Sequence, residues 1–191
     1  MSTWVWIAIA VGVAVIVIIG LRQVLAHRRT SHLRERFGPE YDRTLESADN
    51  KRKAEADLAD REQRRDEFDI RPLSAAARER YVASWQGTQI QFVDDPAAAV
   101  SAAESLIESV MAERGYPVED FDQRADDLSV DYPDVVENYR TARDLSRKGE
   151  TEDLRRAMRC QRMLFEQLVG EPAETAETAE TAETAETAGR R

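Results

Sequence analysis

Cysteine and histidine are scarce in this 191-residue chain, and their scarcity excludes several kinds of chemistry. Cys160 is the single cysteine, so no intramolecular disulfide can form. The two histidines, His27 and His32, lie shortly after the N-terminal apolar run, and none follows them. A His/Cys metal site and a histidine general base are therefore not expected in the rest of the chain. Glycine-rich phosphate loops, paired-cysteine motifs and Gly-x-Ser-x-Gly elbows are missing too, so we expect neither a cofactor nor an enzyme.

Glycine is also rare, with eight residues, whereas charged residues make up 34% of the chain. This balance favours helices with long solvated faces over a sheet-rich sandwich. After an N-terminal anchor and a C-terminal repeat are set aside, roughly 140 residues remain, enough for one ordinary core. We expect an all-α protein: an N-terminal transmembrane helix, a long solvated stalk helix, a bundle of about four to five helices and a disordered tail.

Positive charge is in deficit overall, since 37 acidic residues face 27 basic ones. Residues 22–36 are the exception, with five arginines and the single acid Glu35. An acidic body repels the phosphate backbone of nucleic acids, which bind to concentrated basic faces. We therefore expect no nucleic-acid partner, and we interpret the basic segment through its place in the chain.

The clearest feature is a run of nineteen uncharged residues, 3–21, dominated by Val, Ile and Ala. At ~1.5 Å per residue, a helix of this length nearly crosses the ~30 Å hydrocarbon core of a bilayer. Trp4 and Trp6 suit the aromatic belt at one interface. The alternative is a cleaved signal peptide, but a basic segment before the run is missing and Arg22 would fall in the cleavage region. We expect a retained membrane anchor over 1–24, with the lipid bilayer as partner of residues 3–21.

The charge that flanks the run predicts its orientation. Five arginines follow it within about fifteen residues, namely Arg22, Arg28, Arg29, Arg34 and Arg36, and only the α-amino group precedes it. The positive-inside rule places the N-terminus outside and the body in the cytoplasm of a single-pass cell-membrane protein; a body on the external face is the alternative. Arg22, Arg28 and Arg29 would lie at the membrane interface, where they could also attract anionic head groups. Ala8 and Gly12 form a small-xxx-small pair that permits self-association.

The remaining chain divides at breaks in its helical pattern. Pro39 suits a helix start, and no Gly or Pro interrupts the sparsely apolar stretch 40–69, which predicts the stalk within a segment 25–72. A helical domain, 73–170, follows, with Ser74, Asp95 and Thr151 as expected helix caps and Gly115, Gly149 and Gly170 as stops. Prolines 117 and 133 each suggest the start of another helix. The tail, 171–191, contains five Ala-Glu-Thr triplets without large apolar groups, which predicts disorder.

Three groups of side chains in the body invite a chemical interpretation. Tyr81, Trp85 and Phe121 either belong to the core, the preferred interpretation, or line a ligand pocket. Asp122, Asp126 and Asp127 form an acidic cluster, yet the ligand spacing of a calcium loop is missing, so a solvated helix face is the better explanation. Cys160 lies at the edge of an apolar stripe and is expected to be an inert, partly packed thiol.

Several segments, including 32–44, 69–73, 92–96, 114–117 and 136–139, resemble an uncharacterised family of small actinobacterial single-pass membrane proteins. The similarity extends over about residues 33–168. It implies an anchored helical domain and no reaction chemistry. The leading hypothesis is a non-enzymatic, membrane-tethered interaction or scaffold module with an unidentified protein partner; the alternative is a membrane-tethered sensor of a small ligand or of envelope stress.

Overall fold

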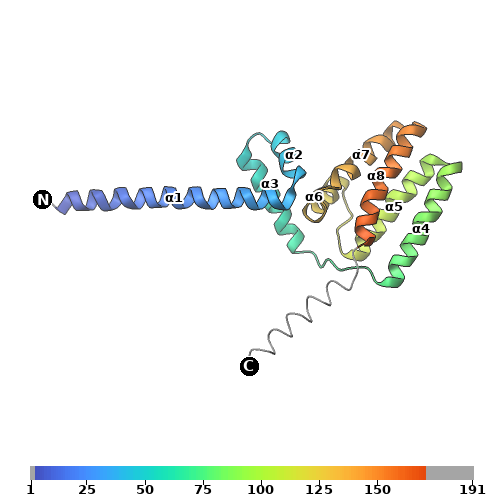
Figure 1. Cartoon of the computed structure of the whole chain (residues 1–191), viewed down its shortest axis with the longest axis horizontal. Helices are drawn as coiled ribbons and strands as arrows, with labels where there is room; N and C mark the ends of the chain where they lie inside the picture. Colours follow the sequence, from blue (N-terminus) through green and yellow to red (C-terminus); the bar gives the residue numbers. More distant parts are fainter. Residues whose placement is uncertain (1–2, 171–191) are drawn as a thin grey trace, which may run out of the picture. The chain divides into compact units, whose positions relative to one another are not determined.

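The computed structural model describes residues 3–170, and within this range all of the regular secondary structure is helical. The N-terminal helices are α1 (Thr3–Phe37), α2 (Pro39–Ser47) and α3 (Lys51–Asp66). The helices that follow are α4 (Ala75–Asp94), α5 (Pro96–Arg114), α6 (Phe121–Asp131), α7 (Val136–Lys148) and α8 (Thr151–Gly170) (Figure 1). The expected disordered tail, 171–191, lies outside the described residues. Five helices, α4 to α8, form the body, which agrees with the expected bundle.

The chain separates into two compact units, residues 1–60 and 61–191. The second unit therefore begins inside α3, before the start at residue 73 that the sequence suggested. The sequence interpretation placed all of 25–72 in a single connecting segment. The structure instead assigns the first part of that segment to one folded unit and residues from Arg61 onward to the other.

In the first unit, α1 is one continuous helix through the apolar run and the basic segment (Figure 1). No proline or glycine interrupts 21–37, and Gly38, with φ +45°, ends the helix just before Pro39. Among residues whose side chains are described, no helix is both long and apolar enough for a membrane span. The side chains of most of 3–19, including Ala8 and those of Trp4 and Trp6, lie outside the described residues. The transmembrane span therefore stays a prediction.

The long solvated stalk expected over 40–69 is wrong, because the chain bends at 48–50 and forms two helices. Asn50 begins the second of them, accepting a 3.0 Å hydrogen bond on its side chain from the backbone N–H of Lys53. The sparse apolar residues of this region are then buried together with the end of α1: Leu33, Phe37, Tyr41, Ala54 and Leu58. Burial of these side chains explains why the helix folds back instead of extending into solvent.

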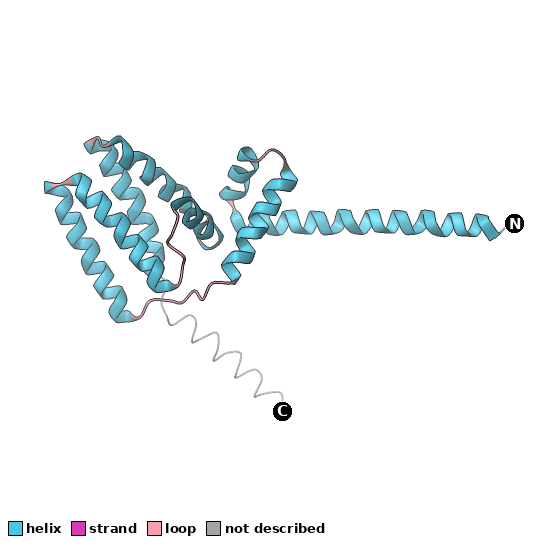
Figure 2. Ribbon diagram, turned by 180° about the vertical axis from the view of Figure 1, so that it is seen from behind, coloured by secondary structure: helices cyan, strands magenta, loops and turns pink. Residues whose placement is uncertain are grey.

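The second unit is built from two antiparallel helical hairpins, α4–α5 and α7–α8 (Figure 2). Because α5 also packs on α8, the four helices lie in the order α4, α5, α8, α7, and α6 packs against α7. Ser74 and Asp95 cap α4 and α5 as expected, accepting hydrogen bonds from backbone N–H groups at 3.1 and 3.0 Å. Gly115 and Gly149 end α5 and α7 in positive-φ conformations.

Four expected helix boundaries differ in detail. The two Tyr-Pro segments precede their helices instead of opening them, since α6 begins at Phe121 and α7 at Val136. Asp120 determines the first of these starts, because its carboxylate accepts hydrogen bonds from two backbone N–H groups, those of residues 122 and 123. Thr151 is the first residue of α8, and Gly170 is its last.

Gly115 has a second role besides ending α5. A Cβ atom at this position would lie 2.2 Å from the backbone oxygen of Asp69, so the linker before α4 passes directly over the glycine. The backbone N–H of Arg71 fixes this passage by donating a 2.9 Å hydrogen bond to the carbonyl of Arg114. Gly149 also has positive φ, +74°, but a Cβ there would meet nothing within 4 Å.

These two glycines form a matched pair for a stability test. Gly149→Ala is expected to cost about 1 kcal/mol of unfolding free energy, because only the backbone conformation is strained. Gly115→Ala is expected to cost more than about 2 kcal/mol, because the Asp69 carbonyl must also move. Denaturant unfolding of the full chain in detergent micelles, followed by circular dichroism, measures both. Equal losses would show that the linker does not press on Gly115.

Candidate functional site

Tyr81, Trp85 and Phe121 belong to the core, which confirms the preferred interpretation of these aromatic residues. The Trp85 ring stacks on Phe165 of α8 with centroids 4.5 Å apart, and the Phe121 ring lies 4.6 Å from that of Tyr139. The Tyr81 hydroxyl donates a 2.7 Å hydrogen bond to the carboxylate of Glu113. Protein side chains thus occupy the faces that the ligand-pocket hypothesis would have assigned to a ligand.

The acidic residues of α6 form ion pairs instead of the solvated face that the sequence suggested. Arg61 and Arg140 donate to the same oxygen of Asp126 at 2.9 and 3.1 Å. Asp122 alone fits the solvated-face interpretation, with its side chain 88% exposed. The difference arises because arginines far away in sequence lie against α6.

The other two carboxylates of this helix also pair with arginines of α3. Asp131 accepts hydrogen bonds from Arg65 at 2.9 Å on both oxygens, and Asp127 lies 3.5 Å from the guanidinium of Arg64. Burial raises the pKa of Asp127, against a hydrogen bond from Gln123 and the charge of Arg64. In the described part of the chain, no three His, Cys, Asp or Glu side chains are grouped to hold a metal ion.

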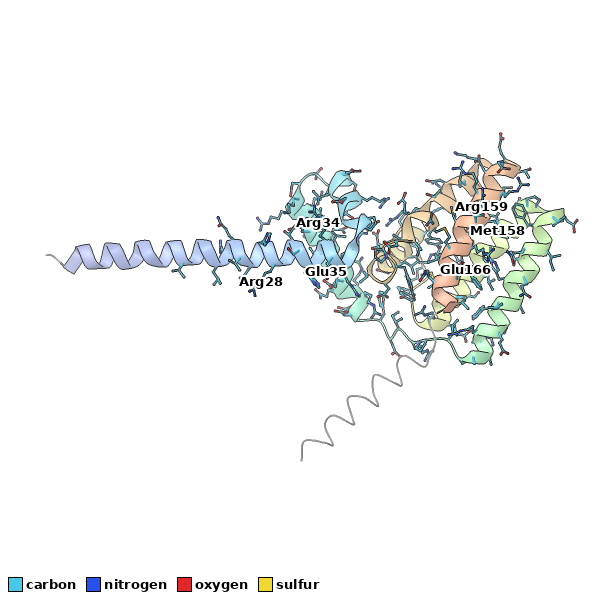
Figure 3. The ribbon with its side chains drawn as sticks, viewed as in Figure 1. Arg28, Arg34, Glu35, Met158, Arg159 and Glu166 are labelled. Carbon is cyan, nitrogen blue, oxygen red and sulfur yellow. The ribbon has the colours of Figure 1, made fainter. Side chains whose placement is uncertain are left out.

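Cys160 is half-buried on α8, as expected for a partly packed thiol. Burial raises its pKa above the ordinary value, against the charges of Arg156 and Arg159. Arg159 is among the α8 side chains labelled in Figure 3. A raised pKa leaves the thiol protonated at neutral pH, which is opposite to the activation that a catalytic cysteine needs.

The first unit contains an open groove of about 550 Å³ that the sequence interpretation missed. Its walls come from the exposed turns of α1 and the first two turns of α3, and its lining residues are Leu25, Arg29, Thr30, Lys51, Arg52 and Glu55. Arg29 was expected at the membrane interface, but Lys51 and Arg52 were interpreted as part of a solvated run. The only sequence signal for the groove is the helix-capping Asn50, which allows α3 to fold back along α1.

Glu55 joins the three helices around this groove. Its Oε1 atom accepts hydrogen bonds from Thr30 of α1 at 2.6 Å and from the hydroxyl of Tyr41 of α2 at 3.0 Å. Lys51 lies 3.5 Å from the same oxygen, and Arg29 donates to the backbone carbonyl of Glu55 at 3.2 Å. This single residue therefore positions two of the three groove cations.

The carboxyl group of Glu55 is held in its charged form. Burial opposes ionisation, but hydrogen bonds from Thr30 and Tyr41 and the charge of Lys51 outweigh it and lower the pKa below the ordinary value of 4.5. A carboxyl group with a lowered folded pKa stabilises the fold above its unfolded pKa, and the contribution is lost as the pH falls through the folded pKa. The first unit should therefore lose this support below about pH 4.5.

The other arginines expected at the interface have described side chains on the exposed turns of α1, where Arg22 and Arg28 face solvent. Figure 3 labels Arg28 together with Arg34 and Glu35, which lie further along the same helix. Arg34 lies 5.1 Å from the centre of the Tyr41 ring and 3.5 Å from Asp42, so it packs on α2. The basic side chains after the apolar run thus fall into two groups. Arg34 packs within the first unit, whereas Arg22 and Arg28 are exposed to solvent.

Replacing Glu55 tests its position at the junction of the helices. Glu55→Gln keeps the size but removes the charge, and it is expected to destabilise the first unit by about 1 kcal/mol at pH 7. Hydrogen exchange of the α2 amides in the full chain should then accelerate about fivefold, while exchange in α4–α8 stays unchanged. The ratio of variant to native rates should shrink as the pH falls below about 4.5.

Glu46→Gln is the control for this measurement, because Glu46 is an exposed glutamate of α2, the helix whose amide exchange is followed. It should leave the exchange rates within error of those of the native chain. Equal acceleration by both variants, or a ratio that does not depend on pH, would show that Glu55 does not hold the three helices.

Comparisons with known proteins identify no relative for this fold and groove: no family model, curated protein or solved structure matches the chain. The resemblance to actinobacterial membrane proteins therefore stays a prediction. The functional argument consequently rests on the residues themselves.

Proposed function

We propose that this chain is a single-pass membrane protein in which the N-terminal part of α1 is the anchor and the helical body is a non-enzymatic interaction or scaffold module. The observation that carries the proposal is the continuity of α1. One helix leads without a break from the apolar run 3–21 into the folded first unit. Such a helix satisfies its own backbone hydrogen bonds, which the bilayer interior requires.

The charge distribution supports an orientation with the body in the cytoplasm of the cell. Arg22, Arg28 and Arg29 follow the apolar run on exposed turns of α1. Basic residues within about 15–20 residues of a span favour the cytoplasmic side. Trp4 and Trp6 would then lie at the opposite interface.

The chemistry of the body supports binding over catalysis. Three acids of α6, Asp126, Asp127 and Asp131, are paired with arginines, and the thiol of Cys160 is kept protonated. The outer helix α4 also exposes apolar side chains, with Ile90 71% and Val93 82% accessible. A helical body with a tethered end and accessible apolar side chains suits contact with a protein partner.

Membrane extraction and reporter fusions test the anchor and its orientation. The full chain should stay in the membrane pellet after alkaline carbonate washing, and substituting Val13→Arg and Ile16→Arg should release it, because each charge near the bilayer centre costs about 3 kcal/mol. A reporter at residue 191 that works only in the cytoplasm should be active, and a matched reporter that works only outside should be silent.

Other results would overturn parts of the proposal. Release of the native chain by carbonate would contradict the proposed anchor. Activity of the external reporter alone would show that the orientation is the opposite of the one proposed. The interaction role is tested by cross-linking the anchored chain in cells. Failure to recover any cross-linked protein with the full chain would count against that role.

A further inference from the structure

We propose that the groove between α1 and α3 binds the phosphate head group of an anionic phospholipid, an inference that rests on the anchoring proposed above. The groove combines three cations, Arg29, Lys51 and Arg52, with one apolar side chain, Leu25. An amphiphile with a negatively charged head and an apolar tail is complementary to this lining, because its head would meet the cations and its tail the apolar side chain. The remaining lining residues, Thr30 and Glu55, hold the two helices together.

The order of side chains along α1 matches the order of layers at a membrane surface. Leu21, Val24 and Leu25 are each more than half exposed, so the apolar surface continues one turn beyond the uncharged run. Arg29 follows Leu25 by four residues and therefore lies on the same helix face, about 6 Å further along the axis. The groove thus has an apolar end on the anchor side and a basic end beyond it.

The distance of the groove from the apolar run also matches the depth of the lipid head groups. If Trp4 and Trp6 occupy the outer interface, the helix from residue 7 to residue 25 spans about 28 Å, close to the ~30 Å hydrocarbon core. Arg22 lies within this stretch, near its end, and its long side chain can reach the head groups. Each head-group layer is about 5–7 Å thick, so Arg29 falls at its level.

The second wall supplies the charges that α1 alone lacks. Lys51 and Arg52 occupy the first turn of α3, and both are exposed. Both cations are oriented by the fold-back of α3, because Glu55, one turn later, is bonded to Thr30 of α1. An anion between the two walls would meet positive charge from both helices.

Glu55 cancels only part of this charge. Three cations and one anion line the groove, which leaves an excess of two positive charges. The Oε1 atom of Glu55 accepts hydrogen bonds from Thr30 and Tyr41 and lies 3.5 Å from Lys51, so Glu55 offsets the charge of one groove cation. An excess of two suits a lipid that carries one or two phosphate groups.

Native mass spectrometry of the full chain in detergent micelles tests the site. The chain is titrated with phosphatidylglycerol and, separately, with phosphatidylcholine, which carries no net charge. The native chain should bind phosphatidylglycerol more tightly, and Lys51→Ala with Arg52→Ala should weaken that binding about tenfold while leaving phosphatidylcholine unchanged. The double variant should stay folded, because cations in a first helical turn oppose the helix dipole.

The control is Arg147→Ala with Lys148→Ala, which removes one arginine and one lysine from exposed neighbouring positions in α7. It should bind phosphatidylglycerol as the native chain does. Equal weakening by the two double variants, or no preference of the native chain for the anionic lipid, would overturn the inference. Displacement of the lipid by millimolar inorganic phosphate would assign the groove to a free anion and overturn it as well.

Carbonate extraction of the same variants separates this inference from the anchoring proposal. Loss of the native chain from the membrane pellet refutes the anchor. Retention in the pellet together with unselective lipid binding refutes the groove alone. Hydrogen exchange of α2 in the Lys51→Ala, Arg52→Ala variant should match that of the native chain, and a tenfold acceleration there would attribute the lipid effect to unfolding and overturn the site.

Discussion

The ionised carboxylate of Glu55 is the contact on which the first unit depends, because it is where α1, α2 and α3 meet. The hydroxyls of Thr30 and Tyr41 bind one of its oxygens from two different helices. Charged acceptors form stronger hydrogen bonds than neutral ones, so one residue can compensate for a small apolar core. The basic groove exists only while this junction keeps the start of α3 beside α1.

Charge has a comparable role in the second unit, where arginines of α3 pair with the carboxylates of α6. Each of two such pairs has one buried partner: the Arg61 side chain is 8% exposed and that of Asp127 only 1%. Their partners, Asp126 and Arg64, are 30% and 38% exposed, so the pairs are partly buried. Buried ion pairs add little net stability compared with apolar packing, but removing one partner is costly. The pairs therefore specify where α6 lies more than they strengthen the fold, which the aromatic and aliphatic core of α4, α5, α7 and α8 already holds.

Local signals in the sequence were sufficient for much of this structure. The side chains of Ser74 and Asp95 and the positive φ of Gly115 act within one helical turn, and the composition alone indicated an all-helical chain. The bend at 48–50 has a weaker local signal, since no proline or glycine marks it and only Asn50 is a helix-capping residue there. Burial of Tyr41 and Leu58 decides it, and that burial exists only after the chain has folded back.

The candidate site was hidden for the same reason. Arg65 and Asp131 are 66 residues apart, and a single sequence does not indicate which distant arginine a given aspartate will meet. Lys51 and Arg52 likewise resemble ordinary surface charge until α3 turns back toward Arg29. The tight passage of the linker over Gly115 was equally hidden, because the glycine itself indicated only a helix end.

The unbroken course of α1 joins the N-terminal apolar run directly to the first unit. Leu33 and Phe37, which are buried in that unit, belong to the same helix as Thr3. A helix that runs without a break passes a tilt or rotation of one end to the other. A bilayer that is thinner or thicker than the apolar run imposes such a tilt. In an anchored chain, membrane thickness would therefore set the angle at which the first unit stands on the surface.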